Sequence, residues 1–526
     1  MPDLDSESLY RALLAKDTRF DGRFFVGVAT TGVYCRPVCR ARKPLAVNCS
    51  FYATAAEAEQ AGFRPCLLCR PELAPGYAPV DSSASLARAA ARYIERNCGV
   101  QGSLTDIARH LGCSNRHLRR VFEDAYHVRP VEYRQTCRLL LAKSLLTDTD
   151  LSVVDVAYAA GFGSLRRFNE VFRRRYRLTP TALRSQARLN RADGDTVQLS
   201  LGYRPPYRWD LILKFLARRA IPGVEKVEDD RYARTIRLRS SGRDLTGWVA
   251  VGNDSEHNRL AVTVSASLLP ALPVVLDGIK NLFDLHCEPD TVAGALTSMD
   301  DSTLGPFIPG TRVPGCFDAF ETAVLAVLGQ QVTVQAARTL AGRLVQALGS
   351  PLDTGIDGLT TTFPMVQELL NLNGAIEQHL GPLGIIAARA RAIHGLAAMI
   401  SSGIIDASCC PDPEAAVTRF MEIPGIGAWT ANYIAMRCLA WPDAFLATDL
   451  EVRKALRTPS PGKILTLAEC WKPWRAYAVM HLWNRAEAKS APEHATKSKK
   501  RNEKKEEMHY LSHYESPLGA MTMASD

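Results

Sequence analysis

Four cysteines near the start of the chain have the types and spacing of a metal site. Cys35 and Cys39 form one close pair, and Cys66 and Cys69 form a second pair 26 residues further on. Four thiols in two close pairs suit one tetrahedral zinc ion. Zinc keeps its thiol ligands as thiolates, and the thiolate is the nucleophilic form of cysteine. The pattern therefore predicts either a structural zinc site or a zinc-activated nucleophile.

A second set of candidate residues lies far along the chain. Residues 423–427, Ile-Pro-Gly-Ile-Gly, predict a tight turn between two helices whose bare backbone amides can approach a phosphate. Trp429 and Tyr433 are four residues apart, so they would share one helix face. Asp449 precedes a helical stretch and would be its N-cap, a position that fixes the orientation of the carboxylate. Taken singly, each aromatic residue would be assigned to the core.

The whole chain has the length and composition of several ordinary globular domains. Its 526 residues predict three or four domains, and a hydrophobic fraction of 47% is enough for their cores. No apolar run is long enough for a membrane helix, and no secretory signal is recognisable, which predicts a cytoplasmic, nucleoid-associated protein without a membrane partner. The net charge of +9 is compatible with nucleic acid.

The residues around the cysteines sharpen the first prediction. The stretches 24–40 and 54–71 closely resemble the zinc domain of Ada-type DNA alkylation-repair regulators. The resemblance implies that Cys35 irreversibly accepts a methyl group from a DNA methylphosphotriester, with one Zn²⁺ held by the four cysteines. A methylated Cys35 would be a neutral thioether, so repulsion from DNA would fall. Arg36 and Arg40 could hold a DNA phosphate beside the site.

An internal repeat follows the cysteine region. Ala108 and Gly112 recur 49 residues later, and Phe122 recurs 50 residues later, each time in a helix, a tight turn and a second helix. A spacer that is apolar at helical intervals, 132–146, would form one connecting helix. Two such units resemble the AraC-type DNA-binding domain. The expected DNA-binding residues on the two second helices are Arg116, Arg119, Arg120, Arg166 and Arg167.

The region from 196 to 486 resembles the AlkA-type 3-methyladenine DNA glycosylases of the helix-hairpin-helix superfamily. The matching stretches include 204–209, 282–285, 314–321, 328–332, 423–431 and 471–483. The resemblance implies that Asp449 stabilises positive charge on the deoxyribose and that Trp429, Tyr433 and Trp483 line the base pocket. It further implies that Pro424, Gly425 and Gly427 anchor the DNA backbone, where a monovalent cation could also bind. Gln331 takes the place of an apolar residue that fills the gap left by the flipped base.

Two absences refine this assignment. Trp429 stands where many strand-cutting relatives carry a lysine, so a monofunctional enzyme is predicted. Cys470 has no neighbouring cysteines, so no iron–sulfur cluster is expected.

We therefore predict a multidomain, mainly α protein. It would comprise a small α+β zinc domain, two helix-turn-helix units, an α+β glycosylase subdomain and an all-α helix-hairpin-helix domain. A charged linker and a truncated fragment, which resembles the start of an O6-alkylguanine methyltransferase or is simply a stray hairpin, would follow. The predicted ranges are 1–75, 81–187, 196–280, 281–486, 487–507 and 508–526.

The predicted function is DNA alkylation repair together with its regulation. The partners would be double-stranded DNA, at damaged sites and promoters, and RNA polymerase for activation. Two alternatives remain open. The protein could be a methylation-sensing regulator whose glycosylase-like half only binds DNA. It could also be a repair enzyme whose helix-turn-helix units only hold DNA.

Overall fold

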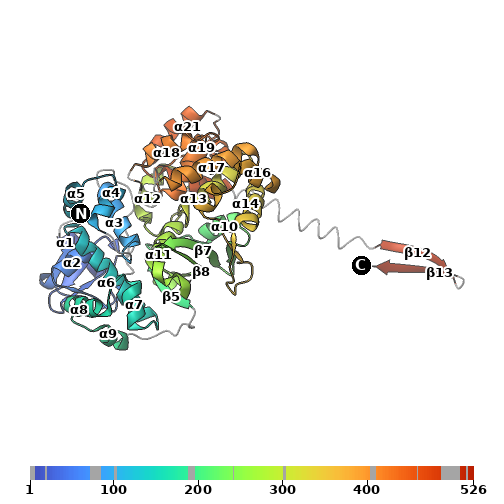
Figure 1. Cartoon of the computed structure of the whole chain (residues 1–526). Helices are drawn as coiled ribbons and strands as arrows, with labels where there is room; N and C mark the ends of the chain where they lie inside the picture. Colours follow the sequence, from blue (N-terminus) through green and yellow to red (C-terminus); the bar gives the residue numbers. More distant parts are fainter. Residues whose placement is uncertain are drawn as a thin grey trace.

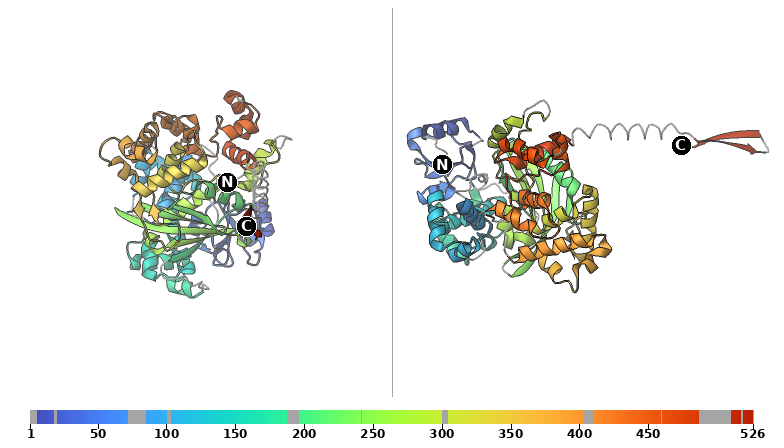
Figure 2. Two further views of the ribbon diagram at one scale, coloured as in Figure 1. Left: turned by 90° about the vertical axis from the view of Figure 1, so that its right-hand side faces the viewer. Right: turned by 90° about the horizontal axis from the view of Figure 1, so that it is seen from above.

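The computed structural model describes most of the chain. Its described residues are 6–17, 20–71, 85–99, 103–186, 196–240, 242–299, 304–402, 410, 412–458, 460–486, 510–516 and 519–525. In Figures 1 and 2 the blue and cyan N-terminal half lies beside a larger green-to-orange half. None of the described helices is both long and apolar enough to cross a bilayer. The predicted linker, 487–507, lies outside the described residues.

The first unit is a small sheet with two helices. Its four strands lie in the order β3-β1-β2-β4, with β4 parallel to β2 and the other pairs antiparallel. Thr54 caps the second helix, Ala55–Gln60, by accepting a hydrogen bond from the backbone N–H of Glu57. The elements are α1 (Ser6–Ala15), β1 (Phe25–Val28), β2 (Val33–Cys35), β3 (Cys49–Tyr52), α2 (Ala55–Gln60) and β4 (Arg64–Pro65).

The second unit contains the two predicted helix-turn-helix motifs. Gly112 and Gly161 adopt φ values of +65° and +80° between the paired helices, a conformation that glycine tolerates best. The predicted connecting helix is observed as α6. The helices are α3 (Ser85–Arg96), α4 (Leu104–His110), α5 (Asn115–Tyr126), α6 (Pro130–Asp148), α7 (Val153–Ala159), α8 (Leu165–Tyr176) and α9 (Pro180–Gln186).

The third unit is an antiparallel five-stranded sheet in the order β5-β9-β8-β7-β6. The alternation of apolar and polar residues in 235–239 and 260–264, which predicts strands, falls within β7 and β9. The elements are β5 (Thr196–Gly202), α10 (Trp209–Arg219), β6 (Glu225–Glu228), β7 (Arg231–Ser240), β8 (Arg243–Asp254), β9 (Arg259–Ser265) and α11 (Leu272–Leu282).

Helices dominate the fourth unit, which Figure 1 shows above the sheet. They are α12 (Pro289–Ala295), α13 (Ala319–Leu328), α14 (Val334–Leu348), α15 (Val366–Leu370), α16 (Ile376–Leu380), α17 (Ala387–Ser401), α18 (Pro413–Met421), α19 (Ala428–Cys438), α20 (Leu450–Ala455) and α21 (Pro461–Leu467), with a short hairpin of β10 (Ser350–Pro351) and β11 (Thr361–Thr362). Residues 475–486 are also helical.

One hydrophobic core extends across the boundary between the N-terminal half and the larger half. Buried residues of the second helix-turn-helix unit, such as Phe168 and Phe172, belong to the same cluster as the interior of the sheet and of the upper helices. The first helix-turn-helix unit instead buries Leu118 and Phe122 in a smaller cluster. The second helix-turn-helix unit is therefore packed as part of the larger half. The C-terminal strands β12 (Tyr510–Ser516) and β13 (Gly519–Ser525) pair as an antiparallel hairpin, which lies apart from this core in Figure 1.

A half-buried carboxylate beside this core is expected to give the stability a pH dependence. Oδ2 of Asp284 accepts hydrogen bonds from the backbone N–H of Val313 (3.1 Å) and the hydroxyl of Tyr477 (2.9 Å). Burial raises the pKa of Asp284 from 3.8 to about 6, although the charge of Arg312 opposes the rise. A raised folded-state pKa adds stability below pH about 4, and this contribution is lost as the pH rises through about 6. Relative to Asp284→Asn, the wild type should lose about 3 kcal/mol of unfolding free energy between pH 4 and 7.

Urea unfolding at a series of pH values measures this difference. Asp353→Asn, at an exposed loop carboxylate, provides the control and should parallel the wild type. Parallel curves for the wild type and Asp284→Asn would show that Asp284 does not titrate in this range.

Candidate functional site

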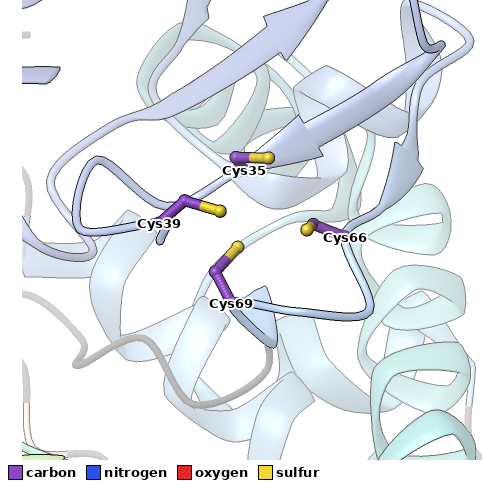
Figure 3. A group of neighbouring side chains, drawn as sticks. All are labelled: Cys35, Cys39, Cys66 and Cys69. Carbon is purple, nitrogen blue, oxygen red and sulfur yellow. The ribbon is translucent and has the colours of Figure 1, made fainter. Parts of the chain in front are cut away.

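The four predicted cysteines lie together in space (Figure 3). Their sulfur atoms all lie within 4.8 Å of one another. Strand β2 ends at Cys35, and the parallel pairing of β4 with β2 places Cys66 beside it, with the backbone N–H of Cys66 donating to the carbonyl of Tyr34 (3.0 Å). Sulfur ligands around one tetrahedral zinc are about 3.8 Å apart, because each Zn–S bond is about 2.3 Å. The donor set and its spacing therefore fit one Zn²⁺ ion.

Hydrogen bonds among the four thiols shift their pKa values in opposite directions, lowering those of Cys39 and Cys66 and raising those of Cys35 and Cys69. A hydrogen bond from the Cys35 thiol is the main cause that lowers the pKa of Cys39 to about 7. The backbone N–H of Arg36 donates to Sγ of Cys69 (3.3 Å). Such hydrogen bonds favour thiolate over thiol, and thiolate is the form that binds metal.

Arg36 connects the cysteine cluster to the larger half of the molecule. Its Nε donates to Oδ1 of Asp21 (2.8 Å), and its second guanidinium contact is to Oδ2 of the same carboxylate. The backbone carbonyl of Asp21 accepts from Nε of Arg204 (3.0 Å), a residue that is only 1% exposed and lies between β5 and α10. Arg36 is thus engaged inside the protein, whereas Arg40 is exposed. A role for either arginine in DNA binding stays a prediction.

The basic side chains of both predicted recognition helices face solvent. In α5, Ser114 caps the helix by accepting from the backbone N–H of His117, and Ser164 caps α8 in the same way. Leu118, Phe122, Phe168 and Phe172 turn inward. The exposed residues of the opposite faces are Arg116, Arg119 and Arg120 in α5, and Arg166, Arg167, Arg173 and Arg174 in α8.

The predicted hairpin is formed by α18 and α19. Gly425 adopts a φ of +93°, Gly427 is the N-cap residue of α19, and both glycines and Pro424 are exposed. The side-chain amide of Gln330 donates to the carbonyl of Gly425 (2.8 Å) and thereby fixes the turn against the loop after α13. Its neighbour Gln331 is exposed with a φ of +55°.

Asp449 lies where the hairpin helix meets helix 475–486. As a helix N-cap it accepts from the backbone N–H groups of Glu451 (3.0 Å) and Val452 (3.1 Å), both through Oδ1. Two indole N–H groups also donate to the carboxylate, that of Trp429 to Oδ2 and that of Trp483 to Oδ1, each at 3.0 Å. The N-cap interpretation is confirmed, and the carboxylate orientation is fixed by the two tryptophans as well.

The predicted aromatic residues form a cluster around this carboxylate. The rings of Trp429 and Tyr433 stack at 5.1 Å with an interplanar angle of 10°, as their spacing of four predicts. The ring of Trp483 lies 6.4 Å from that of Tyr433 and stacks at 6.4 Å on Phe215 of α10. We call Phe215, Trp429, Tyr433 and Trp483 the aromatic cluster.

Sequence reasoning missed one member of the aromatic cluster, Phe215, and two arginines that contact the cluster, Arg219 and Arg437. Phe215 lies on an amphipathic helix, so nothing in its spacing distinguishes it from core. Nη1 of Arg437 donates to the Tyr433 hydroxyl (3.0 Å), and the guanidinium of Arg219 lies 3.7 Å above the Phe215 ring. Burial would raise the pKa of Tyr433, but the charges of Arg437 and Arg219 lower it below its ordinary value.

Comparison with known proteins agrees with this arrangement. The family described as the metal binding domain of Ada matches residues 8–72, a helix-turn-helix domain matches 107–186, and the AlkA N-terminal domain matches 198–318. A probable bifunctional transcriptional activator/DNA repair enzyme AlkA of Mycobacterium tuberculosis is 38% identical over 495 residues, which cover 92% of this chain and 97% of that protein. The chain belongs to this family.

Two shorter relatives each match one half of this Ada/AlkA family member. DNA-3-methyladenine glycosylase 2 of Escherichia coli is 38% identical over 284 residues, covering 54% of this chain and 96% of the relative. The bifunctional transcriptional activator/DNA repair enzyme Ada of Escherichia coli is 36% identical over 159 residues, covering 30% of this chain and 43% of the relative. The predicted family, mainly α fold class and four-cysteine zinc site are thereby confirmed.

Proposed function

We propose that Cys35 is the methyl acceptor of the zinc domain. Its thiolate would attack the methyl carbon of a DNA methylphosphotriester. A sulfur–carbon bond forms, the carbon–oxygen bond breaks, and the electron pair stays on oxygen as a phosphodiester anion. Bound zinc would keep the sulfur ionised before the transfer. The proposal is supported by the position of Cys35 in the cysteine cluster and by the Ada-type match over residues 8–72.

Methylation would then turn the N-terminal half into a transcriptional activator. The cysteine cluster loses one negative charge when Cys35 becomes a thioether, so its repulsion of DNA phosphates decreases. The exposed arginines of α5 and α8 would contact successive major-groove segments. RNA polymerase would be the partner that the DNA-bound form recruits.

We further propose that the C-terminal half is a monofunctional glycosylase for alkylated purines of the 3-methyladenine type. Asp449 would stabilise the positive charge that develops on the deoxyribose as the base leaves. The electron-rich aromatic cluster suits a base that carries a positive charge after methylation. Trp429 occupies the place where strand-cutting relatives have lysine, so no Schiff base would form and the product would be an intact strand with an abasic site.

The observation that carries this proposal is the double indole donation to Asp449, which joins the carboxylate to the aromatic cluster. The test is incubation of the full, zinc-loaded chain with methylated duplex DNA. Free 3-methyladenine without strand cleavage, together with a methylated peptide that contains Cys35, is the expected result. Base release accompanied by strand cleavage would refute the monofunctional assignment.

Trp483→Phe is expected to separate the two roles of this indole. Phenylalanine keeps an aromatic ring beside Tyr433 but removes the N–H that donates to Oδ1 of Asp449. Because one hydrogen bond to a charged group is lost, single-turnover base release should slow about tenfold. Trp248→Phe, at a half-buried tryptophan of β8, is the matched control and should retain the wild-type rate. Equal rates for all three proteins would show that the indole N–H does not orient Asp449.

A further inference from the structure

A buried carboxylate in α2 contacts strand β2, the strand that ends at Cys35. Glu59 in α2 is 0% exposed. It accepts a hydrogen bond from the hydroxyl of Tyr34 (3.1 Å), the residue that precedes Cys35 in β2. The carbonyl of Tyr34 in turn accepts from the backbone N–H of Cys66 (3.0 Å). Tyr34 is therefore bonded on one side to the metal-binding segments and on the other side to Glu59.

The other partners of Glu59 belong to the connecting helix α6 and to α8, the second helix of the second helix-turn-helix unit. Thr136 of α6 donates through Oγ1 (3.0 Å). Arg175 and Tyr176, at the end of α8, donate through Nε (3.3 Å) and the phenolic hydroxyl (3.4 Å). Helix α8 is one of the two helices whose exposed arginines are expected to contact DNA. One carboxylate thus joins β2, α6 and α8.

Because Glu59 is buried, its carboxylate depends on these hydrogen-bond donors. A carboxylate removed from water is costly unless hydrogen-bond donors and a cation compensate it, and removing one partner leaves the charge unsatisfied. The four donors of Glu59 come from three elements in two domains, and Arg175 supplies the cation. If β2 shifts, either Tyr34 must leave the carboxylate or α8 must follow. The carboxylate therefore favours movement of the two elements together.

We propose that Glu59 is a positioning residue that couples the state of the cysteine cluster to the placement of helix α8. Zinc binding at the cluster and methylation of Cys35 would each change the placement of α8. The change would pass through Tyr34, Glu59 and Arg175. The methylation step rests on the proposed function, whereas the zinc step does not.

Hydrogen exchange of α8 tests the coupling directly. The full chain is compared with zinc bound and after zinc removal, as wild type and as Glu59→Gln. In the wild type, zinc removal should speed amide exchange in α8 about tenfold or more. In Glu59→Gln the zinc-loaded protein should already exchange faster by about tenfold, because the glutamine amide group meets donors and loses the charge-assisted bond to Arg175. Zinc removal should then add little.

Glu57→Gln is the matched control on the same helix, since Oε2 of Glu57 accepts a local hydrogen bond from the backbone N–H of Ala53 (2.8 Å). It should respond to zinc as the wild type does. Thr136→Val, which removes a single donor, gives a milder second variant if Glu59→Gln does not fold, and it should show the same change in smaller measure. The proposal would be overturned if amide exchange in α8 of the wild type did not change on zinc removal, or if Glu59→Gln kept the full wild-type response.

Methyl uptake separates this proposal from the proposed function. Glu59→Gln should take up methyl groups from methylphosphotriester DNA within about twofold of the wild-type rate, because Glu59 does not touch a cysteine sulfur among its described contacts. If the wild type takes up no methyl groups, the acceptor role of Cys35 is refuted. The exchange measurements would still decide whether Glu59 couples the cysteine cluster to α8.

Discussion

Asp449→Asn is expected to lower the single-turnover rate of base release by about 10³-fold, while binding of duplex DNA persists. The loss of the negative charge removes the stabilisation of the deoxyribose cation in the transition state. Both oxygens of the carboxylate accept hydrogen bonds, one from the indole N–H of Trp429 and one from that of Trp483. The NH₂ group of asparagine cannot accept, so one indole N–H would lose its partner. The measurement is release of 3-methyladenine from methylated duplex under enzyme excess.

A second N-cap aspartate in the same domain provides the control. Asp412 caps α18 by accepting from the backbone N–H of Ala415 (2.9 Å). Asp412→Asn should lose some stability, as a weakened cap does, but should keep the wild-type rate of base release. If Asp449→Asn also stays within about threefold of the wild type, Asp449 is only a cap. If the wild type binds DNA tightly but releases no base, the C-terminal half is a binding module and the protein is first a regulator.

Cys35→Ser is expected to abolish methyl uptake, with a rate at least about 10³-fold below that of the wild type. A serine hydroxyl stays protonated at neutral pH and is a much weaker nucleophile than a zinc-bound thiolate. The measurement is transfer of labelled methyl groups from methylphosphotriester DNA to protein, followed by identification of the labelled peptide.

Two further variants separate the attacking sulfur from the metal site. Cys49→Ser should keep full uptake, since Cys49 lies outside the four-sulfur cluster and donates instead to the carbonyl of Leu45 (3.3 Å). Cys39→Ser removes one zinc ligand but leaves Cys35 in place, so uptake should fall less than in Cys35→Ser. A labelled peptide that contains Cys66 or Cys69 in the wild type would show that another sulfur of the cluster is the acceptor.

These predictions depend on residues that sequence reasoning could find to different degrees. The cysteine pairs, the repeated helix-turn-helix units and the Pro-Gly turn are recognisable because metal ligation, helix capping and tight turns depend on residues close in sequence. The same holds for Trp429 and Tyr433, because a spacing of four along one helix already stacks their rings. Asp449 is likewise marked by the helix that it opens.

Other contacts were decided by packing between distant elements. Phe215 meets Trp483 across 268 positions of sequence, the Trp483 indole reaches Asp449 across 34, and Glu59 joins Arg175 across 116. Asp21 likewise joins Arg36 to Arg204. Arg36, which the sequence suggests as a phosphate contact, is therefore engaged within the protein.

By itself, then, the sequence determined the cysteine pairs and the helix-turn-helix units through residue spacing, and it determined the family and the candidate carboxylate through resemblance. Only the tertiary structure decided how the two halves are joined and what orients Asp449. Local periodicity states which face of an element is buried, but it carries no information about which other buried face lies against it.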